Sequence, residues 1–423
     1  MDMQIRTTLW THDFTTLALG TVTSAIADVA MSFIMSVIVY VETSSAFLSG
    51  LFFALGLVPN IIIPILSGPF VDGHYKKNFI VICDVLLAIL FLCGYVLFGR
   101  LGFNYILFLI FDLVCGCIGG VYQIAFQAYF PSLIPEGFEE KGYSVSSMIY
   151  PTVSVIFTPL AAVIYNRFGM PIIMLIIGIC LLLSAFIESF IRNKGPKKDI
   201  SFKEKPMKTF LSELKFASGY LKKEKGLEKW YRNVALGGGM WKLRELMAVS
   251  WFTINPLLGL VRYSYLSLAE FAGRSIGGFF NYNVKIRNEH KTPVTIFVYS
   301  FYELCDSLLL FVPYPVMLTL RSLCGFCGIN TAVLRESAVQ SYIPEEDRGK
   351  INSLLSVRSH IVMAIMATVG GAMGDYLGIR ETVLIACAVG FLSIFLNVFL
   401  NRKEISRIFA SVKEDLSTAK FII

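Results

Sequence analysis

The stretch GPFVDGHYKK at residues 68–77 is a short polar segment between two long apolar runs, and a related stretch, GGFFNYNVK, occupies residues 277–285. A shift of 209 positions relates the two, in the pairs Gly68 and Gly277, Asp72 and Asn281, and Lys76 and Lys285. The same shift relates distant positions, among them Gly116 and Gly325, Lys141 and Lys350, Ser144 and Ser353, and Gly169 and Gly378. Because chance matches would not keep one offset over about 100 residues, we infer two homologous halves.

The composition indicates a membrane protein. Of 423 residues, 55% are hydrophobic and only 16% are charged, whereas soluble domains carry about 25% Asp, Glu, Lys and Arg. Apolar runs of about 20 residues recur, each long enough to cross a hydrocarbon core of about 30 Å as a helix. We therefore expect an all-α polytopic membrane protein with twelve transmembrane helices in two six-helix halves. The spans are expected near residues 14–40, 45–68, 77–99, 103–126, 143–165, 171–191, 231–252, 256–280, 293–312, 315–335, 351–374 and 380–400.

The halves are expected at residues 1–192 and 231–423, joined by a cytoplasmic linker at 193–230, with a short cytoplasmic tail at the end. The net charge is +7, and basic residues are densest from Arg192 to Arg232. Because clusters of Lys and Arg mark cytoplasmic loops, we expect a plasma-membrane protein with both termini in the cytoplasm. Apolar residues at helical spacing among the linker lysines predict either a basic helix on the inner membrane surface or a solvated linker helix. The first apolar run lacks the features of a signal peptide, so we expect it to be retained as a span.

Many charged residues fall inside the predicted spans, where each costs about 2.5–3.5 kcal/mol on insertion scales. They include Asp28, Asp112, Glu270, Arg274, Glu303, Asp306, Arg321, Arg358 and His360. Chains keep such groups when they line a cavity or find a partner, so we predict a polar interior between the helices. The candidate proton-coupling or substrate-cavity residues are Asp28, Asp112, Glu303, Asp306, Arg321 and Arg358.

Asp28 is the strongest candidate for a proton carrier, because it is a lone acid in the small-residue stretch Ser24-Ala25-Ile26-Ala27-Asp28, which can face a cavity. The alternative is a carboxylate held by a hydrogen bond to a neighbouring helix. Glu303 and Asp306 are three positions apart and therefore share a helix face. They could hold a proton or a cation, or they could pair with Arg321 or Arg358.

The seventh span is interrupted by Lys242, Arg244 and Glu245, but the shift of 209 positions places it opposite the first span. These charges could offer an anion site. Alternatively, Glu245 neutralises one of them locally, or the span is displaced toward an interface. Glycines four positions apart in residues 273–277 and 370–378 predict close helix packing and not a site.

Other chemistry is not indicated. The chain has no Gly-x4-Gly-Lys-Ser/Thr loop, so we expect no built-in ATPase. Its four histidines are scattered, and its cysteine pairs at 115–117 and 324–327 lie in apolar runs, which favours packing over metal or redox chemistry. We expect no metal, no cofactor, no enzymatic activity and no nucleic-acid partner.

Twelve predicted spans in two halves, a long basic centre and the hinge after the second span resemble the Major Facilitator Superfamily. That family's hinge reads Gly-x-x-x-Asp-Arg-x-Gly-Arg-Arg/Lys, and the matching positions here are Gly68, Asp72, Lys76 and Lys77. Gly73 and Tyr75 replace the first Arg and the second Gly. The resemblance implies that Asp72 helps to latch the outward-facing state, and that Gly277 and Asn281 form the corresponding hinge of the second half.

Within the superfamily, the pattern is similar to the bacterial efflux branch that includes macrolide and siderophore exporters. An Asp in the first span and an Asp after the hinge recur there, as Asp28 and Asp84 do here, the second near the cytoplasmic end where it can pair with basic loop residues. The resemblance implies a secondary active transporter that moves a small molecule by alternating access and proton-coupled efflux. The resemblance also implies that the protein's partners are the substrate, protons and membrane lipid, and that the protein is a monomer. A proton-coupled uptake symporter of a polar solute and a non-transporting receptor or scaffold are the alternatives.

Overall fold

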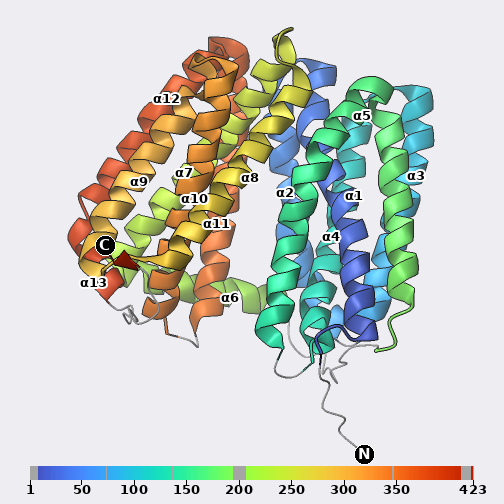
Figure 1. Ribbon diagram of the computed structural model, residues 1–423, viewed down its shortest axis with the longest axis horizontal. Helices are drawn as coiled ribbons and strands as arrows, with labels where there is room; N and C mark the ends of the chain where they lie inside the picture. The colour runs from blue at the N-terminus through green and yellow to red at the C-terminus, as the bar shows by residue number, and fades with distance from the viewer. Residues whose placement is uncertain are drawn as a thin grey trace, which may run out of the picture. The chain divides into compact units, whose positions relative to one another are not determined.

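The computed structural model describes residues 8–72, 74–135, 138–193, 206–344, 347–410 and 421–422, and almost all of this part is helical (Figure 1). Each predicted span lies on a helix. The helices are α1 (His12–Thr43), α2 (Ala46–Asp72), α3 (Lys76–Leu101), α4 (Tyr105–Tyr129), α5 (Glu139–Ser189), α6 (Pro206–Lys223), α7 (Lys225–Ile254), α8 (Gly259–Asn283), α9 (Asn288–Leu308), α10 (Tyr314–Tyr342), α11 (Arg348–Leu377), α12 (Ile379–Ser393) and α13 (Arg402–Ala410). Shorter elements are the 3₁₀ helices η1 (Phe130–Leu133) and η2 (Leu309–Phe311), the π-helical segment η4 (Ile394–Phe399), and the parallel two-residue strands β1 (Val284–Lys285) and β2 (Phe421–Ile422).

Nine helices of the described residues are long and apolar enough to cross a membrane. One of them, α5, contains two predicted spans, because Gly169 adopts a φ of 76° and turns the chain inside it. The helices α7 and α8 are not among the nine, since both carry several charged residues. The prediction of an all-α polytopic protein is thus confirmed, and the seventh span is a regular helix.

The internal repeat is visible in the backbone. Gly169 separates the two arms of α5, and Gly378, its partner at the shift of 209 positions, separates α11 from α12 with a φ of 103°. Other residues rarely adopt such positive φ values, so glycine is favoured at both turns. Two positions paired by sequence alone therefore make the same kind of interhelical turn.

The chain divides into two compact units. Unit 1 comprises Met1–Glu42 and Leu55–Thr209, and unit 2 comprises Thr43–Ala54 and Phe210–Ile423. In unit 1, α3 packs on α4 and α5. Phe91 of α3 and Phe111 of α4 meet edge to face at 5.1 Å between ring centroids, a favourable geometry for buried aromatic side chains.

Two lysines close the hinge between α2 and α3. Lys76 is only 2% exposed, and its Nζ donates hydrogen bonds to the carbonyls of Val71 (2.6 Å) and His74 (3.2 Å). Lys77 Nζ donates to the carbonyl of Ser189 at the end of α5, at 2.7 Å. Lysines near helix ends satisfy the last carbonyls, which have no partner inside the helix. These contacts hold the ends of α2 and α5 against the start of α3.

Unit 2 depends on close helix contacts at glycines. A Cβ added at Gly273 of α8 would lie 1.8 Å from the carbonyl oxygen of Ser322 on α10, and one at Gly325 of α10 would lie 2.1 Å from the carbonyl oxygen of Glu270. The backbones of α8 and α10 therefore approach each other where any side chain would collide. This arrangement confirms the packing predicted for the glycines at 273–277.

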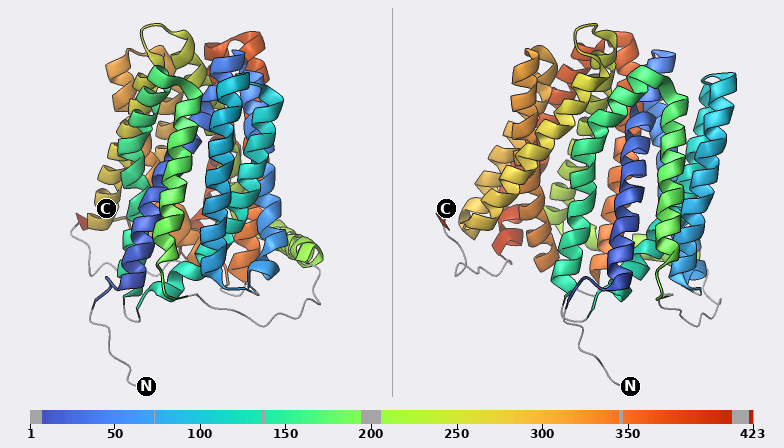
Figure 2. Two further views of the ribbon diagram at one scale, coloured as in Figure 1. Left: turned by 90° about the vertical axis from the view of Figure 1, so that its right-hand side faces the viewer. Right: turned by 45° about the vertical axis from the view of Figure 1, so that its right-hand side comes forward.

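Helix α6 runs crosswise to the long helices of unit 2 (Figures 1 and 2). Its residues Ala217 and Leu221 are buried in a cluster with Trp230 of α7 and Val339 of α10. From Phe210 onward, the segment expected as a linker thus packs into the core of unit 2.

Candidate functional site

A cavity of about 360 Å³ lies among helices α1 to α5 of unit 1. Two acids line it, Asp28 from α1 and Asp84 from α3, and its described lining includes no Lys, Arg or His. The remaining lining residues are Ser24, Asn60, Leu87, Gly119, Gly120, Tyr122, Gln123 and Leu181. Five helices therefore surround a space with two carboxyl groups and several neutral hydrogen-bonding groups.

Asp28 is exposed to this cavity. Within the described residues it forms no ion pair and no hydrogen bond to a neighbouring helix, although that bond was one predicted alternative. The small residues Ser24, Ala25 and Ala27 around it are buried. The structure thus places the carboxyl group where water and solutes can reach it.

Asp84 lines the same cavity and is only 1% exposed. Ser184 of α5 lies beside it, and the Oδ2 atom of Asp84 has no hydrogen-bond partner within the described residues. The expectation that Asp84 pairs with basic residues of the hinge is corrected here, because eight positions after Lys76 it lies two helical turns inside α3. Asp84 therefore lines the cavity and has no basic partner within the described residues.

Glu188 is a third acid of this region, and no motif or spacing in the sequence indicated it. It is fully buried, and neither of its carboxyl oxygens has a hydrogen-bond partner within the described residues. Its side chain packs on Gly20 of α1, where an added Cβ would lie 2.5 Å from Cγ of Glu188. It also lies close enough to Asp84 for their charges to interact. The carboxyl groups of Asp28, Asp84 and Glu188 therefore form one acidic region in unit 1.

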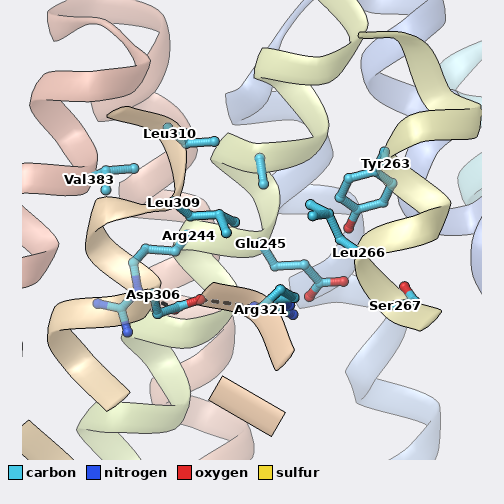
Figure 3. A pocket seen from close by; sticks show the side chains of 11 residues that line it. Arg244, Glu245, Tyr263, Leu266, Ser267, Asp306, Leu309, Leu310, Arg321 and Val383 are labelled. Atoms are coloured by element: carbon cyan, nitrogen blue, oxygen red, sulfur yellow. Dashed lines mark hydrogen bonds and ion pairs between the residues drawn. The ribbon is translucent and has the colours of Figure 1, made fainter. Parts of the chain in front are cut away.

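Unit 2 contains a network of buried ion pairs across α7, α8, α9 and α10. Arg244 of α7 donates from Nε to Oδ2 of Asp306 at 2.6 Å, and from both Nη atoms to the carboxylate of Glu303. Arg321 of α10 donates to Oδ1 of Asp306 at 2.9 Å and pairs with Glu270 of α8 at 2.7 Å. Figure 3 shows Asp306 lying between Arg244 and Arg321.

The charges of this network balance. Arg244, Arg321 and Arg274 face Glu303, Asp306 and Glu270, since Arg274 also pairs with Glu270 at 2.8 Å. The adjoining cavity in Figure 3 has a volume of only about 20 Å³, which is enough for a single water. Asp306 pairs with Arg321, which is one of the predicted alternatives. Glu303 pairs with Arg244. The three acids and three arginines of the network therefore leave no net charge in this conformation.

A second cavity of unit 2, of about 300 Å³, has Trp241, Tyr299 and Tyr302 in its lining. Its charged lining residues Arg274, Glu303 and Arg335 all have ion-pair partners, which are Glu270, Arg244 and Glu336 respectively. Every charged residue that lines this cavity thus has a partner of opposite charge, whereas Asp28 and Asp84 in the cavity of unit 1 have no ion-pair partner within the described residues.

The other charges of the seventh span are paired locally. Lys242 pairs with Glu245 at 2.8 Å, as local neutralisation predicts, so an anion site is not favoured there. Arg358 was predicted as a cavity residue and as a partner of Glu303 or Asp306, but it pairs with Glu228 of α7 at 3.2 Å. Of the two arginines proposed as partners for these acids, only Arg321 is used, since Arg244 and Arg321 together bind Asp306 and Arg244 binds Glu303.

The remaining predicted residues lie elsewhere. Asp112 of α4 does not line the cavity of unit 1 but lies against Gly56 of α2, where an added Cβ would be 2.7 Å from its Oδ2. Gly68 lies inside α2, and the side chain of Asp72 lies outside the described residues. Gly277 of α8 packs on α10, where an added Cβ would be 2.5 Å from Cγ2 of Ile329, and Asn281 follows one turn later.

No cluster of three or more potential metal ligands occurs in the described part of the chain.

Comparisons with known proteins agree with this architecture. The family model described as Major Facilitator Superfamily matches residues 17–287 and 290–420. No curated protein sequence matches the chain significantly. Among solved structures, the fold is similar to that of the nucleoside transporter NupG, with 12% identity, a TM-score of 0.67, and coverage of 94% of this chain and 100% of that one. It is also similar to the POT family transporter PepTSo, with 10% identity, a TM-score of 0.67, and coverage of 93% and 98%.

A third similar structure is a bacterial homologue of the human lysosomal transporter Spinster in an inward-facing and unoccupied conformation, with 12% identity, a TM-score of 0.57 and 99% coverage of both chains. At these identities the structural likeness shows the fold alone. The family model covers nearly the whole chain, including both repeated halves. The chain belongs to the Major Facilitator Superfamily.

Proposed function

We propose that this protein is a secondary transporter that moves a polar or charged small molecule across the plasma membrane by alternating access, coupled to protons. Membership of the superfamily and the internal repeat support the transport mechanism, because paired repeats can rock about a site between them. The chain acts as a monomer with both termini in the cytoplasm. Segments 1–192 and 231–423 serve as its moving halves.

The coupling proton is carried by Asp28. The observation that carries this assignment is the accessible carboxyl group of Asp28 in the cavity of unit 1, without a basic partner within the described residues. A carboxylate without a partner becomes costly to keep charged once the cavity around it loses its water. The neutral, protonated form of this carboxyl group is therefore favoured when water leaves the cavity, and the ionised form is favoured when water returns.

The direction we propose is export, in which protons enter as the substrate leaves. The similarity of Asp28, Asp84 and the hinge to exporters of macrolides and siderophores supports this direction. Uptake by proton symport is the alternative, since the solved structures of similar fold include a nucleoside transporter and POT family transporters.

Reconstituted proteoliposomes carrying an internal pH dye test the proposal. A panel of polar and charged solutes is added outside at equal pH on both sides. Entry of a solute by exchange removes protons from the interior, so the interior becomes alkaline, whereas entry by symport makes it acidic. We expect at least one solute to make the interior more alkaline than it does in protein-free liposomes, which measure the passive entry of uncharged solute. If no solute changes the internal pH, proton-coupled transport is contradicted.

A further inference from the structure

The cavity of unit 1 differs from the cavities of unit 2 in its charge balance. Every charged residue that lines the 300 Å³ cavity of unit 2 has an ion-pair partner. In unit 1, Asp28 and Asp84 line the cavity without an ion-pair partner within the described residues. Glu188 adds a third unpaired acid next to Asp84. A positive charge is therefore the missing component of this site.

The position of Asp84 is the most direct sign of a ligand. Its side chain is 1% exposed, it lines the cavity, and its Oδ2 has no hydrogen-bond partner within the described residues. A carboxylate oxygen withdrawn from water without a partner is strongly unfavourable, and a bound cation that donates a hydrogen bond to it removes most of that cost.

The shape of the cavity selects the kind of cation. The volume of about 360 Å³ is far larger than a metal ion requires, and the described residues contain no cluster of three metal ligands. The neutral lining supplies acceptors at Asn60 and Gln123 and apolar surface at Leu87 and Leu181. An organic molecule with one ammonium group and an apolar body matches both parts of this lining.

We propose that the cavity of unit 1 binds protonated organic amines, with the ammonium group donating hydrogen bonds to Asp84 and Asp28 and the apolar part lying against Leu87 and Leu181. The inference rests on the proposed transport function, for which it names the substrate class. It is independent of the coupling ion and of the transport direction, because it concerns equilibrium binding in one unit.

Equilibrium dialysis of the full-length protein in detergent tests the proposal without any gradient. The probes are 2-phenylethylamine, the neutral 2-phenylethanol and the anion phenylacetate, which share a phenyl ring but differ in charge. At mildly alkaline pH, we expect the amine to bind about tenfold more tightly than the alcohol or more, because a hydrogen bond to a charged group contributes more than a neutral one. Phenylacetate is expected not to bind. Equal binding of the amine and the alcohol, or no binding of the amine, overturns the proposal.

Variants locate the binding. Asp84→Asn and Asp28→Asn should each weaken amine binding about tenfold or more and leave alcohol binding unchanged, and Asp84→Glu should keep part of the affinity. Glu42→Gln is the matched control, since Glu42 is an exposed acid of the same helix as Asp28, about 21 Å away along α1, and does not line the cavity. Thermal unfolding of each variant verifies that it is folded.

The outcomes separate this proposal from the transport function. Amine binding that does not depend on Asp84 or Asp28 contradicts the site, even if proteoliposomes show proton-coupled transport. Amine binding that depends on both residues supports the site, even if no proton flux is found, in which case the proposed coupling fails alone.

Discussion

Nε of Arg244 on α7 lies 2.6 Å from Oδ2 of Asp306 on α9. The other oxygen of Asp306 accepts a hydrogen bond from Nη1 of Arg321 on α10, and the remaining donors of Arg244 bind Glu303. Asp306 is 3% exposed and Arg244 is 4% exposed, so the pair is shielded from water. One carboxylate between two guanidinium groups thus connects three helices of unit 2.

Replacing Arg244 should destabilise the folded protein. We expect Arg244→Gln to lower the free energy of unfolding by about 3–5 kcal/mol, because it leaves the buried carboxylate of Glu303 without its ion-pair partner and Asp306 with Arg321 alone. The double variant Arg244→Gln with Glu303→Gln removes one charge of each sign and should recover part of the loss. Thermal or denaturant unfolding in detergent measures both.

Arg358→Gln is the control for that prediction. Arg358 also pairs with a glutamate of its own unit, Glu228, but their side chains are 36% and 29% exposed. A pair with this exposure contributes about 0–1 kcal/mol. Equal losses for Arg244→Gln and Arg358→Gln would show that burial of the network does not determine its contribution.

The glycines of α8 allow a second comparison. Gly273→Ala should destabilise the protein by about 1–3 kcal/mol or more, because its new Cβ would overlap the backbone of α10 at Ser322. Gly278→Ala should be neutral or stabilising, since an added Cβ there meets nothing within 4 Å and alanine favours helix. The melting temperatures of the two variants are the readout. A stable Gly273→Ala protein would contradict the close packing of α8 on α10.

The start of α2 depends on a residue of α11. Asp375 accepts hydrogen bonds from Oγ of Ser45 (2.7 Å) and from the backbone N–H groups of Ala46 (2.8 Å) and Phe47 (3.0 Å). Since a carboxylate at a helix N-terminus satisfies free N–H groups, Asp375→Ala should cost about 1–2 kcal/mol.

Hydrogen exchange of the peptide that contains Ala46 and Phe47 measures this effect. We expect exchange about tenfold faster in Asp375→Ala, and an intermediate rate in Asp375→Asn, which keeps one acceptor oxygen. Unchanged exchange in Asp375→Ala would mean that α2 does not need this cap.

Much of the fold is predictable from local sequence. The length of each apolar run is set by the thickness of the hydrocarbon core, so all twelve predicted spans lie on helices. The turn glycines Gly169 and Gly378 were paired by the repeat alone, and both adopt positive φ. The ion pair of Lys242 and Glu245 was also predictable from the sequence, because residues three positions apart on a helix are neighbours.

Tertiary partners were not predictable in the same way. Arg244 binds Glu303, which is 59 residues away on another helix, and nothing in the spacing of the single sequence indicates that contact. Glu188 lies near the end of its apolar run, and nothing in the single sequence indicates that packing against Gly20 of α1 buries it completely. Asp84 was assigned to the hinge by resemblance, and only the helix packing of unit 1 reveals that it shares a cavity with Asp28.

The role of Asp28 as a proton carrier is the central claim, and solute movement in proteoliposomes tests it most directly. Asp28→Asn keeps the shape of the side chain but can neither bind nor release the coupling proton. At saturating solute, the variant should therefore still exchange labelled for unlabelled solute down its gradient, but it should not accumulate solute when a pH gradient is imposed. Asp28→Glu should keep part of the accumulation, and Glu42→Gln should keep all of it. Accumulation by Asp28→Asn equal to that of the unaltered protein would contradict the account.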